Sequence, residues 1–257
     1  RQTLPADIPG NAGVGNAIVA VDRTVLWTTA CVASGVNYIL KTVDGGAHWT
    51  KQAEIDLASG GCFSRIHAYD AQNAWVVGRR TTPPDDYIGV IYHTSDGGRT
   101  WTAQAEQQET LIDVVAVSPT TAWISGKSGV GLRTLDGGVT WQPINTGTAH
   151  DLNRIFTGDG NDVWMTGDHS ALIHTTNGLA PAGQVHWTQS DAPVGGLYLM
   201  TITFVDAQFG WLTNSLVEGA EQRGYVFRSD DGGGVWDAQT VPANSGLWNL
   251  IMVKNAQ

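Results

Sequence analysis

The stretch Thr94-Ser-Asp96-Gly-Gly-Arg-Thr-Trp101 decides the fold, because its pattern recurs along the chain. The unit Thr/Ser-x-Asp-Gly-Gly-x-x-Trp starts again at three other residues, Thr42, Thr134 and Ser229. A divergent copy starts with Thr175-Thr-Asn177-Gly178 and reaches its tryptophan, Trp187, after an insertion. The closing tryptophans follow one another at intervals of 40 to 52 residues. A repeat of this period predicts a propeller or a solenoid array.

Each repeat contains two further apolar runs that are typical of β-strands. One is built on a tryptophan, as in Ala74-Trp75-Val-Val-Gly78, and a β-branched run such as Asp113-Val-Val-Ala-Val117 precedes it. With the strands on either side of the Asp-Gly-Gly turn, this gives four antiparallel strands per unit, which is one propeller blade. We therefore expect an all-β chain, a β-propeller of four-stranded antiparallel blades. Five complete blades fit residues 17–53, 63–105, 111–145, 152–190 and 198–240.

The two ends of the chain resemble single strands without a blade of their own. Residues 1–6 resemble the last strand of a blade, and residues 247–253 resemble a first strand. Residues 1–257 are accordingly expected to form a single propeller domain. Either both ends assemble a sixth sheet, or the chain is part of a six- or seven-bladed wheel. We favour the second arrangement, because the first and last strands of a blade are not neighbours.

The composition is acidic and rich in glycine and tryptophan. Charged residues make up 15% of the chain, the formal net charge is −10, and there are 32 glycines and 11 tryptophans. With four lysines, at Lys41, Lys51, Lys127 and Lys254, the chain lacks the basic footprint of a nucleic-acid partner or an anionic membrane surface. It has no apolar run of the roughly 20 residues that a spanning helix needs, so direct membrane insertion is not expected. The absence of Asn-x-Ser/Thr sequons favours a bacterial origin.

The Asp-Gly-Gly-x-Thr-Trp units resemble the Asp-box repeats of bacterial neuraminidases. Combined with runs such as Ala74–Gly78, they are most similar to the propeller family of the photosystem II stability and assembly factor. In that family the propeller docks a client protein during assembly of a membrane complex, and an arginine-rich surface contributes. The resemblance implies a non-catalytic binding or assembly scaffold with a protein partner. Arg65 and Arg154 are the arginines that could take the place of that surface. The acidic net charge of this chain, however, differs from what an arginine-rich surface would give.

The residues of the repeat itself are expected to be structural. Each carboxylate caps its own turn through backbone N–H groups, the glycines supply positive φ angles, and the tryptophan stacks between blades. Calcium binding or catalysis by these aspartates is the alternative. The residues concerned are Asp44, Trp49, Asp96, Trp101, Asp136, Trp141, Asn177, Trp187, Asp231 and Trp236.

Binding is expected on the face opposite the Asp-Gly-Gly turns. Alternating strand direction places the loops between the second and third strands there, and these loops are longest in blades two and five. Binding residues generally lie on such variable loops, whereas the plainer interpretation is a solvated loop. The candidates are Arg79, Arg80, Asp85, Asp86, Tyr87, Glu221 and Arg223.

A second candidate site is the channel mouth on the same face. Arg65, Asp113 and Arg154 occupy equivalent positions of successive first strands, each followed by an apolar residue. The two guanidinium groups could clamp a carboxylate. Alternatively, the three residues form an ion-pair network that ties adjacent blades together.

Two cysteines, Cys31 and Cys62, follow and precede strands of neighbouring blades on this face, so we expect a disulfide rather than two unpaired thiols. Such a bond would place the protein in an oxidising compartment, either secreted or periplasmic.

Signatures of other chemistry are weak. The seven histidines show no zinc-site spacing and there is no phosphate-binding loop, so neither metal nor cofactor is expected. A glycoside hydrolase remains the enzymatic alternative and would need two carboxylates about 5–9 Å apart. Asp113 with Glu109, Asp151 or Asp168 could supply them, but Phe63-Ser-Arg65-Ile-His67 lacks the proline of the sialidase motif. A sugar-binding lectin that uses exposed aromatic residues is the third possibility. The oligomeric state cannot be inferred from the sequence.

Overall fold

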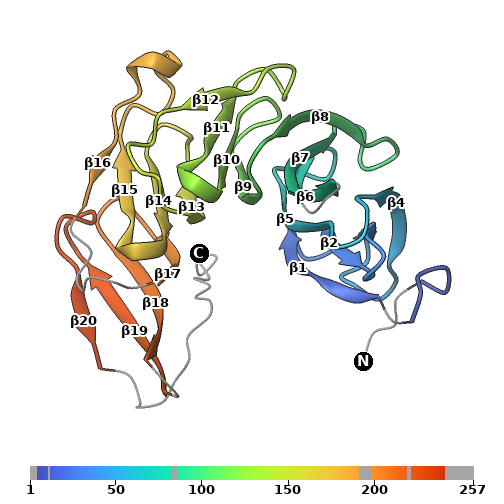
Figure 1. The fold of residues 1–257 in the computed structure, drawn as a ribbon, viewed down its shortest axis with the longest axis horizontal. Coiled ribbons are helices and arrows are strands. Elements are labelled where there is room, and N and C mark those ends of the chain that lie inside the picture. The colour runs from blue at the N-terminus through green and yellow to red at the C-terminus, as the bar shows by residue number, and fades with distance from the viewer. Residues whose placement is uncertain (1–4, 11, 83–85, 191–197, 219–220, 241–257) are drawn as a thin grey trace. The chain divides into compact units, whose positions relative to one another are not determined.

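The structure is a computed structural model that describes residues 5–10, 12–82, 86–190, 198–218 and 221–240. In these ranges the chain is all-β, with twenty strands and three short 3-10 helices. The strands form five four-stranded antiparallel sheets, each with its strands in chain order (Figure 1). The predicted fold class, built from four-stranded antiparallel blades, is confirmed.

Each sheet corresponds to one sequence repeat. The first holds β1 (Gly13–Ala20), β2 (Leu26–Cys31), β3 (Val36–Thr42) and β4 (Thr50–Asp56). The second holds β5 (Cys62–Ala68), β6 (Ala74–Thr82), β7 (Asp86–Thr94) and β8 (Thr102–Gln107). The third holds β9 (Leu111–Ala116), β10 (Ala122–Gly126), β11 (Gly131–Thr134) and β12 (Gln142–Ile144). The fourth holds β13 (Leu152–Thr157), β14 (Val163–Gly167), β15 (Leu172–Thr175) and β16 (Thr188–Gln189). The fifth holds β17 (Tyr198–Phe204), β18 (Gly210–Glu218), β19 (Glu221–Ser229) and β20 (Asp237–Gln239).

The two terminal strands expected from the sequence are not among these elements. Residues 1–4 and 247–253 lie outside the described residues. Residues 5–8 form a turn, in which the Ile8 N–H donates to the Pro5 carbonyl at 3.0 Å. The three 3-10 helices are η1 (Lys127–Gly129), η2 (Asp168–Ser170) and η3 (Ala182–Gln184), all within or between blades three and four.

The chain divides into two compact units. The first comprises residues 1–126 and 132–142, and the second comprises residues 127–131 and 143–257. The single-domain organisation expected from the repeat stays a prediction.

In the first unit the opening strands of successive sheets lie side by side. β5 contacts both β1 and β9, and β2 also packs against β5. A shared core fills the space between the first two sheets, where Trp27, Phe63, Ile66 and Val76 are almost fully buried. Ile66 therefore packs back onto the preceding sheet.

The position that Ile66 occupies in its strand is apolar in the first strand of every sheet, and it is exposed in one of them. Val114, Ile155 and Ile202 are buried like Ile66, whereas Ile18 is 63% exposed. Because Ile66 packs on the preceding sheet and no described sheet precedes β1, Ile18 has no equivalent surface to cover it.

In the second unit β13 lies beside β17, and β14 also contacts β17. The core between the two sheets is aromatic: Trp164, Phe204, Phe227 and Trp236 are buried in one cluster. Trp236, which closes the fifth repeat, packs edge-on against Trp164 of the fourth sheet with centroids 6.3 Å apart. In the first unit Trp101 meets Trp27 of the preceding sheet in the same way, at 5.8 Å.

The four Asp-Gly-Gly segments form closely similar turns, and in the longer fifth copy Asn177 Oδ1 accepts from the Thr175 hydroxyl and the His186 N–H. We call all five the acid–glycine turns (42–49, 94–101, 134–141, 175–187 and 229–236). At Asp96, Oδ1 accepts hydrogen bonds from the Thr94 hydroxyl and the Thr100 N–H, and Oδ2 accepts from the Thr100 hydroxyl. The bonds from Thr100, followed by the one from Thr94, lower the pKa of Asp96 to about 2. Gly97 donates its N–H to the Gln72 carbonyl of the turn between β5 and β6. In this turn both carboxylate oxygens of Asp96 thus accept hydrogen bonds from the turn itself, and Gly97 joins the turn to a neighbouring one.

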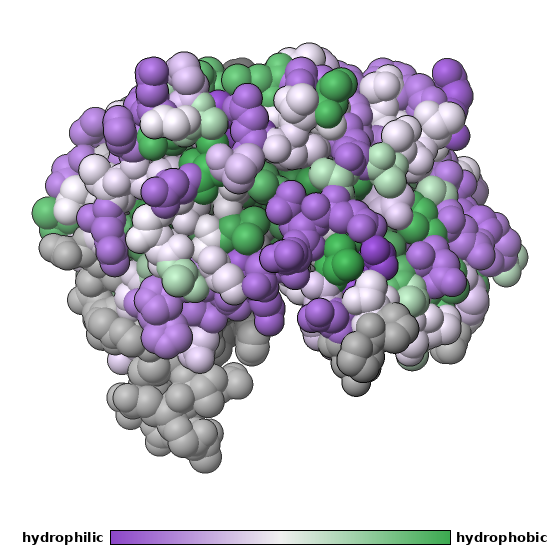
Figure 2. Space-filling model, turned by 45° about the horizontal axis from the view of Figure 1, so that its top comes forward, coloured by the Kyte–Doolittle hydropathy of each residue, from purple (hydrophilic) through white to green (hydrophobic). Residues whose placement is uncertain are grey.

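Apolar side chains are exposed singly over the surface. Val139 and Val43, on two acid–glycine turns, are 84% and 67% exposed. Figure 2 shows a face on which hydrophobic residues form small patches between hydrophilic ones. Scattered exposure of this kind is ordinary for folded domains. Within the ranges that the structure describes, no helix has the length and apolar character to cross a membrane.

Candidate functional site

The first two residues of the predicted channel-mouth column form an ion pair between neighbouring sheets. Nε of Arg65 on β5 lies 3.0 Å from Oδ1 of Asp113 on β9, and their side chains are 20% and 6% exposed. Asp113 Oδ1 also accepts the Val114 N–H at 3.0 Å. Asp113 is therefore engaged from two sides, by Arg65 of the neighbouring sheet and by the backbone of its own strand.

Arg154, the third residue of the column, lies on β13 in the second unit. It is half-buried, and its Nη1 donates to the carbonyl of Asn153 at 2.7 Å. Asp168, on η2 of this unit, accepts from the Asn153 amide at 2.7 Å. Asp151, which lies just before β13, accepts the Ser128 N–H at 2.9 Å. Asp151 and Asp168, two of the three carboxylates considered as catalytic partners of Asp113, thus already accept hydrogen bonds from the backbone or from a neighbouring amide.

The long segment of blade two is a strand pair rather than a loop. β6 and β7 stay in register beyond their last pairs with the outer strands, Cys62↔Arg79 and Gly89↔Gln107, and continue through Arg80↔Ile88 to Thr82↔Asp86. Thr81 also donates its N–H to the Leu57 carbonyl at 3.1 Å, which fixes the extension to the first sheet. Residues 79–82 and 86–89 are called the β6–β7 extension below. Asp85 lies outside the described residues.

The β6–β7 extension presents an aromatic ring among charges. The Arg79 guanidinium lies over the Tyr87 ring, 4.8 Å from its centroid, and Tyr87 is 44% exposed. Arg80 makes a two-point ion pair with Glu106 of β8, Nε to Oε1 at 2.8 Å and Nη2 to Oε2 at 2.9 Å. This pairing raises the pKa of Arg80 and lowers the pKa of Glu106. Asp86 is exposed. Alternation along the strands places Arg79 and Tyr87 on one face of the extension and Arg80, Asp86 and Glu106 on the other.

Blade five has an equivalent extension in the second unit. β18 and β19 pair as far as Leu216↔Arg223 and Glu218↔Glu221. The side chains of Glu221 and Arg223 lie outside what the structure describes. The two longest predicted loops are therefore both extended strand pairs.

The predicted disulfide between Cys31 and Cys62 is present. It joins the end of β2 to the start of β5 in the first unit, with Cα atoms 6.2 Å apart. Because Cys31 belongs to the first sheet and Cys62 to the second, the bond links neighbouring blades.

A repeated cationic or imidazole residue was not anticipated. The residue before each turn Thr or Ser faces the strand tryptophan across the sheet: Trp27↔Lys41, Trp75↔His93, Trp164↔His174 and Trp211↔Arg228. Lys41 Nζ lies 4.3 Å from the Trp27 ring centre, and its pKa is lowered by burial. Arg133 similarly lies over Trp123. The signal was visible in the sequence as Lys, His, Arg, His and Arg immediately before Thr42, Thr94, Thr134, Thr175 and Ser229.

The second unit contains a pocket of about 310 Å³ between its fourth and fifth sheets. Its lining includes the buried rings of Trp164 and Phe204 and the half-buried ring of Phe156. Three exposed carboxylates also line it: Asp159 and Asp162 from the turn between β13 and β14, and Asp206 from the turn between β17 and β18. We call it the acidic pocket.

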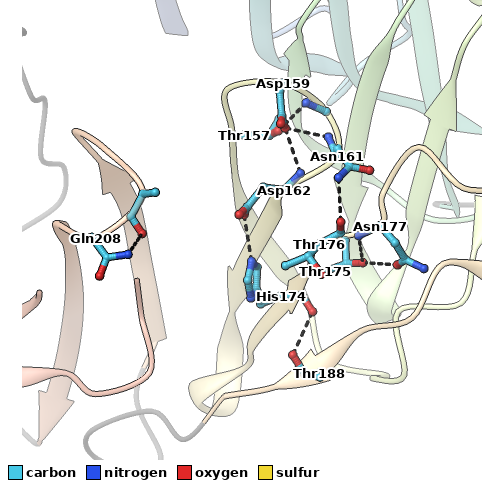
Figure 3. A network of polar contacts seen from close by, with 12 residues as sticks. Thr157, Asp159, Asn161, Asp162, His174, Thr175, Thr176, Asn177, Thr188 and Gln208 are labelled. Carbon is cyan, nitrogen blue, oxygen red and sulfur yellow. Dashed lines mark hydrogen bonds and ion pairs between the residues drawn. The ribbon is translucent and has the colours of Figure 1, made fainter. Parts of the chain in front are cut away.

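Hydrogen bonds fix the walls of the acidic pocket. Asp159 Oδ1 accepts the N–H groups of Asn161 and Asp162 at 2.8 and 2.9 Å. Asp162 Oδ1 lies 2.9 Å from Nε2 of His174, whose ring stacks on Trp164 with centroids 3.9 Å apart. Figure 3 shows Asp162 and His174 pointing toward one another, with Gln208 of the other turn across from them. Among the described residues, no group of three or more His, Cys, Asp or Glu side chains could hold a metal ion.

Comparisons with known proteins identify relatives and solved structures that resemble the chain. No protein-family model matches it. It is 30% identical over 129 residues to the photosystem II assembly lipoprotein Ycf48 of Synechococcus sp. (strain CC9902). This alignment covers 47% of this chain and 35% of that protein. It is 27% identical over 164 residues to the photosystem II assembly protein Ycf48 of Thermosynechococcus vestitus, covering 61% of this chain and 44% of that protein. The matches thus span less than half of the length of these two relatives.

Among solved structures, YCF48 bound to D1 peptide has a TM-score of 0.57 at 17% identity, covering 90% of this chain and 83% of that one. The GH74 enzyme of Niastella koreensis has a TM-score of 0.64 at 17% identity, covering 88% of this chain and 38% of that one. At these identities the two likenesses establish the fold alone. They are consistent with the propeller blades predicted from the repeat.

Proposed function

We propose that this protein is a non-catalytic scaffold that binds a polypeptide partner, and that the β6–β7 extension is part of its docking surface. The proposal depends mainly on the observation that the β6–β7 extension is a paired strand hairpin that carries aromatic and charged side chains. The extension places Tyr87, Arg79 and the Arg80–Glu106 pair on a rigid strand pair joined to the rest of the sheet. Tyrosine and arginine are enriched in protein–protein interfaces, and tyrosine supplies contact area at little entropic cost.

The similarity to the Ycf48 proteins supports the same proposal. A YCF48 protein has been solved bound to D1 peptide. We extend peptide binding to this chain as a class of function and leave the sequence of the partner open.

The hydrolase alternative is disfavoured by the state of the carboxylates. Asp113 is nearly buried and paired with Arg65, and Asp151 and Asp168 hold the N–H of Ser128 and the amide of Asn153. A glycosidase needs two carboxyl groups that flank the scissile bond about 5–9 Å apart. Asp113, Asp151 and Asp168 are instead engaged by other groups of the protein. The Cys31–Cys62 disulfide supports a location outside the cytoplasm, secreted or periplasmic.

Site-specific photo-crosslinking tests the proposal. A photoreactive phenylalanine replaces Tyr87 in one variant and Val139, which is exposed on an acid–glycine turn, in a control variant. Both are expressed in cells of the source organism, and adducts are identified by mass spectrometry. We expect one polypeptide to be captured repeatedly at position 87 and not at 139, and to be lost when Arg79→Ala is added.

Equal labelling at both positions, or none at position 87, would contradict the proposed docking surface. A glycan array run with the same protein covers the lectin alternative. Glycan binding at micromolar concentration without polypeptide capture would replace the proposal with that alternative.

A further inference from the structure

We infer that the acidic pocket of the second unit is a binding site for a single basic side chain, lysine or arginine, of a polypeptide. This inference rests on the proposed function only in that a polypeptide partner supplies such side chains. The pocket is separate from the β6–β7 extension, which belongs to the first unit.

The chemistry of the lining defines the class of ligand. Asp159, Asp162 and Asp206 contribute three carboxylates, and the lining residues that the structure describes include no lysine or arginine. A neutral apolar group in the pocket would take water away from these carboxylates without supplying a counter-charge, which is unfavourable. A cation provides that counter-charge and gains charge-assisted hydrogen bonds.

The aromatic lining calls for a cation that carries an apolar stem. Phe156, Trp164 and Phe204 form a continuous group of rings, with Phe156 and Phe204 at 5.5 Å and Trp164 and Phe204 at 5.4 Å between centroids. Lysine and arginine lay their methylene stems along apolar surface while the charged end stays with polar groups. A volume of about 310 Å³ lies at the lower end of ligand pockets, which suits one side chain.

The carboxylates are held in place before any ligand arrives. Asp206 Oδ1 accepts the N–H groups of Gln208 and Phe209 at 2.9 and 2.8 Å, as Asp159 does in its own turn. The His174 ring fixes Asp162 and is itself stacked on Trp164. Binding therefore requires little reordering of the protein side, which favours affinity.

The test measures binding of three blocked amino acids to the full chain by NMR titration. The probes are the N-acetyl methylamides of lysine, arginine and norleucine, the last being a neutral analogue of lysine. We expect the lysine and arginine probes to shift resonances of the aromatic lining and to bind at least about tenfold more tightly than norleucine. Binding of the charged probes should weaken as salt rises.

The decisive variant is Asp159→Asn with Asp206→Asn. Asparagine keeps an oxygen for the turn N–H groups and removes the charge, so the fold should persist while binding falls about tenfold or more. Asp22→Asn with Asp70→Asn is the matched control, because both residues accept the same turn N–H bonds in the first unit. It should bind the probes as the unmodified protein does.

Norleucine binding as tight as lysine, unchanged binding by the pocket variant, or an equal loss in the control variant would each overturn the inference. The probes contain no partner sequence, so the outcome is independent of the crosslinking result. Probe binding without any capture at position 87 would remove the proposed docking surface and leave the pocket as a basic side-chain site.

Discussion

The imidazole of His93 lies flat on the indole of Trp75, with ring centroids 4.0 Å apart and an interplanar angle of 22°. The two residues face one another across β6 and β7. His174 and Trp164 repeat the arrangement in the fourth sheet at 3.9 Å, and Lys41 covers Trp27 in the first. The same strand register thus places a histidine or lysine side chain over each of these three tryptophans. These contacts connect the second and third strands of each sheet through their side chains.

The burial of His93 predicts a loss of stability in mild acid. Desolvation lowers its pKa to about 4 in the folded protein, from 6.5 in the open chain. Because the unfolded chain takes up the proton first, the contribution of His93 is complete above about pH 6.5 and is lost as the pH falls toward 4. Urea unfolding at pH 7.5 and 4.5 should show a smaller decrease for His93→Phe, which keeps the stack, than for the unmodified protein.

An exposed imidazole provides the control for this experiment. His186→Gln changes a side chain on the surface and should keep the pH dependence of the unmodified protein. If His93→Phe loses as much stability between the two pH values as the unmodified protein does, His93 is not the responsible group.

The Arg65–Asp113 ion pair should be energetically coupled. Because Asp113 is almost buried and the pair joins neighbouring sheets, a double-mutant cycle with Arg65→Met and Asp113→Asn is expected to give a coupling free energy of about 1–3 kcal/mol. The exposed Arg80–Glu106 pair, measured by the same cycle with Arg80→Met and Glu106→Gln, should give a smaller value, since solvent screens it. Equal coupling in both pairs would show that burial is not the cause.

Gly98 should tolerate a methyl group less well than another glycine with positive φ. A Cβ at Gly98, where φ is +91°, would lie 2.9 Å from the Trp27 ring, whereas one at Gly147, where φ is +74°, meets no atom within 4 Å. Gly147→Ala therefore has only the backbone penalty, about 1–2 kcal/mol, and Gly98→Ala adds an overlap of about 1–3 kcal/mol. Thermal unfolding of both variants measures the difference, and equal destabilisation would contradict the packing argument.

The sequence was sufficient for the blades and their turns, because both are local. Asp96 and Thr94 are two residues apart, and the hydrogen bonds between them follow from that spacing alone. The Cys31–Cys62 bond was also accessible, since two cysteines in a repeat of known strand order have one plausible pairing.

What could not be predicted depends on register and on packing between repeats. Pro83-Pro84 with its charged neighbours indicated a loop, yet pairing continues up to Thr82↔Asp86 on both sides of it. The stack on Trp75 needed the register of β6 and β7, which no single repeat specifies. The acidic pocket brings together Asp159 and Asp206 from turns of two different repeats. Both lie five residues before a strand tryptophan, as Asp22 and Asp70 do in the first unit, so the sequence marks their turns but not the packing that brings them together.

The disulfide should account for a measurable share of the stability of the first unit. It closes a loop of 31 residues, for which the chain-entropy model gives about 3–4 kcal/mol. Cys31→Ser with Cys62→Ser should lower the free energy of unfolding by this amount and should make it insensitive to reductant, whereas the unmodified protein should fall to the level of the variant when reduced. Because the bond also ties β2 to β5, hydrogen exchange in the variant should rise first at the start of β5, next to Phe63, rather than in the second unit. Exchange that rose uniformly over both units, or stability unchanged by reduction, would show that the sheets of the first unit are held together without it.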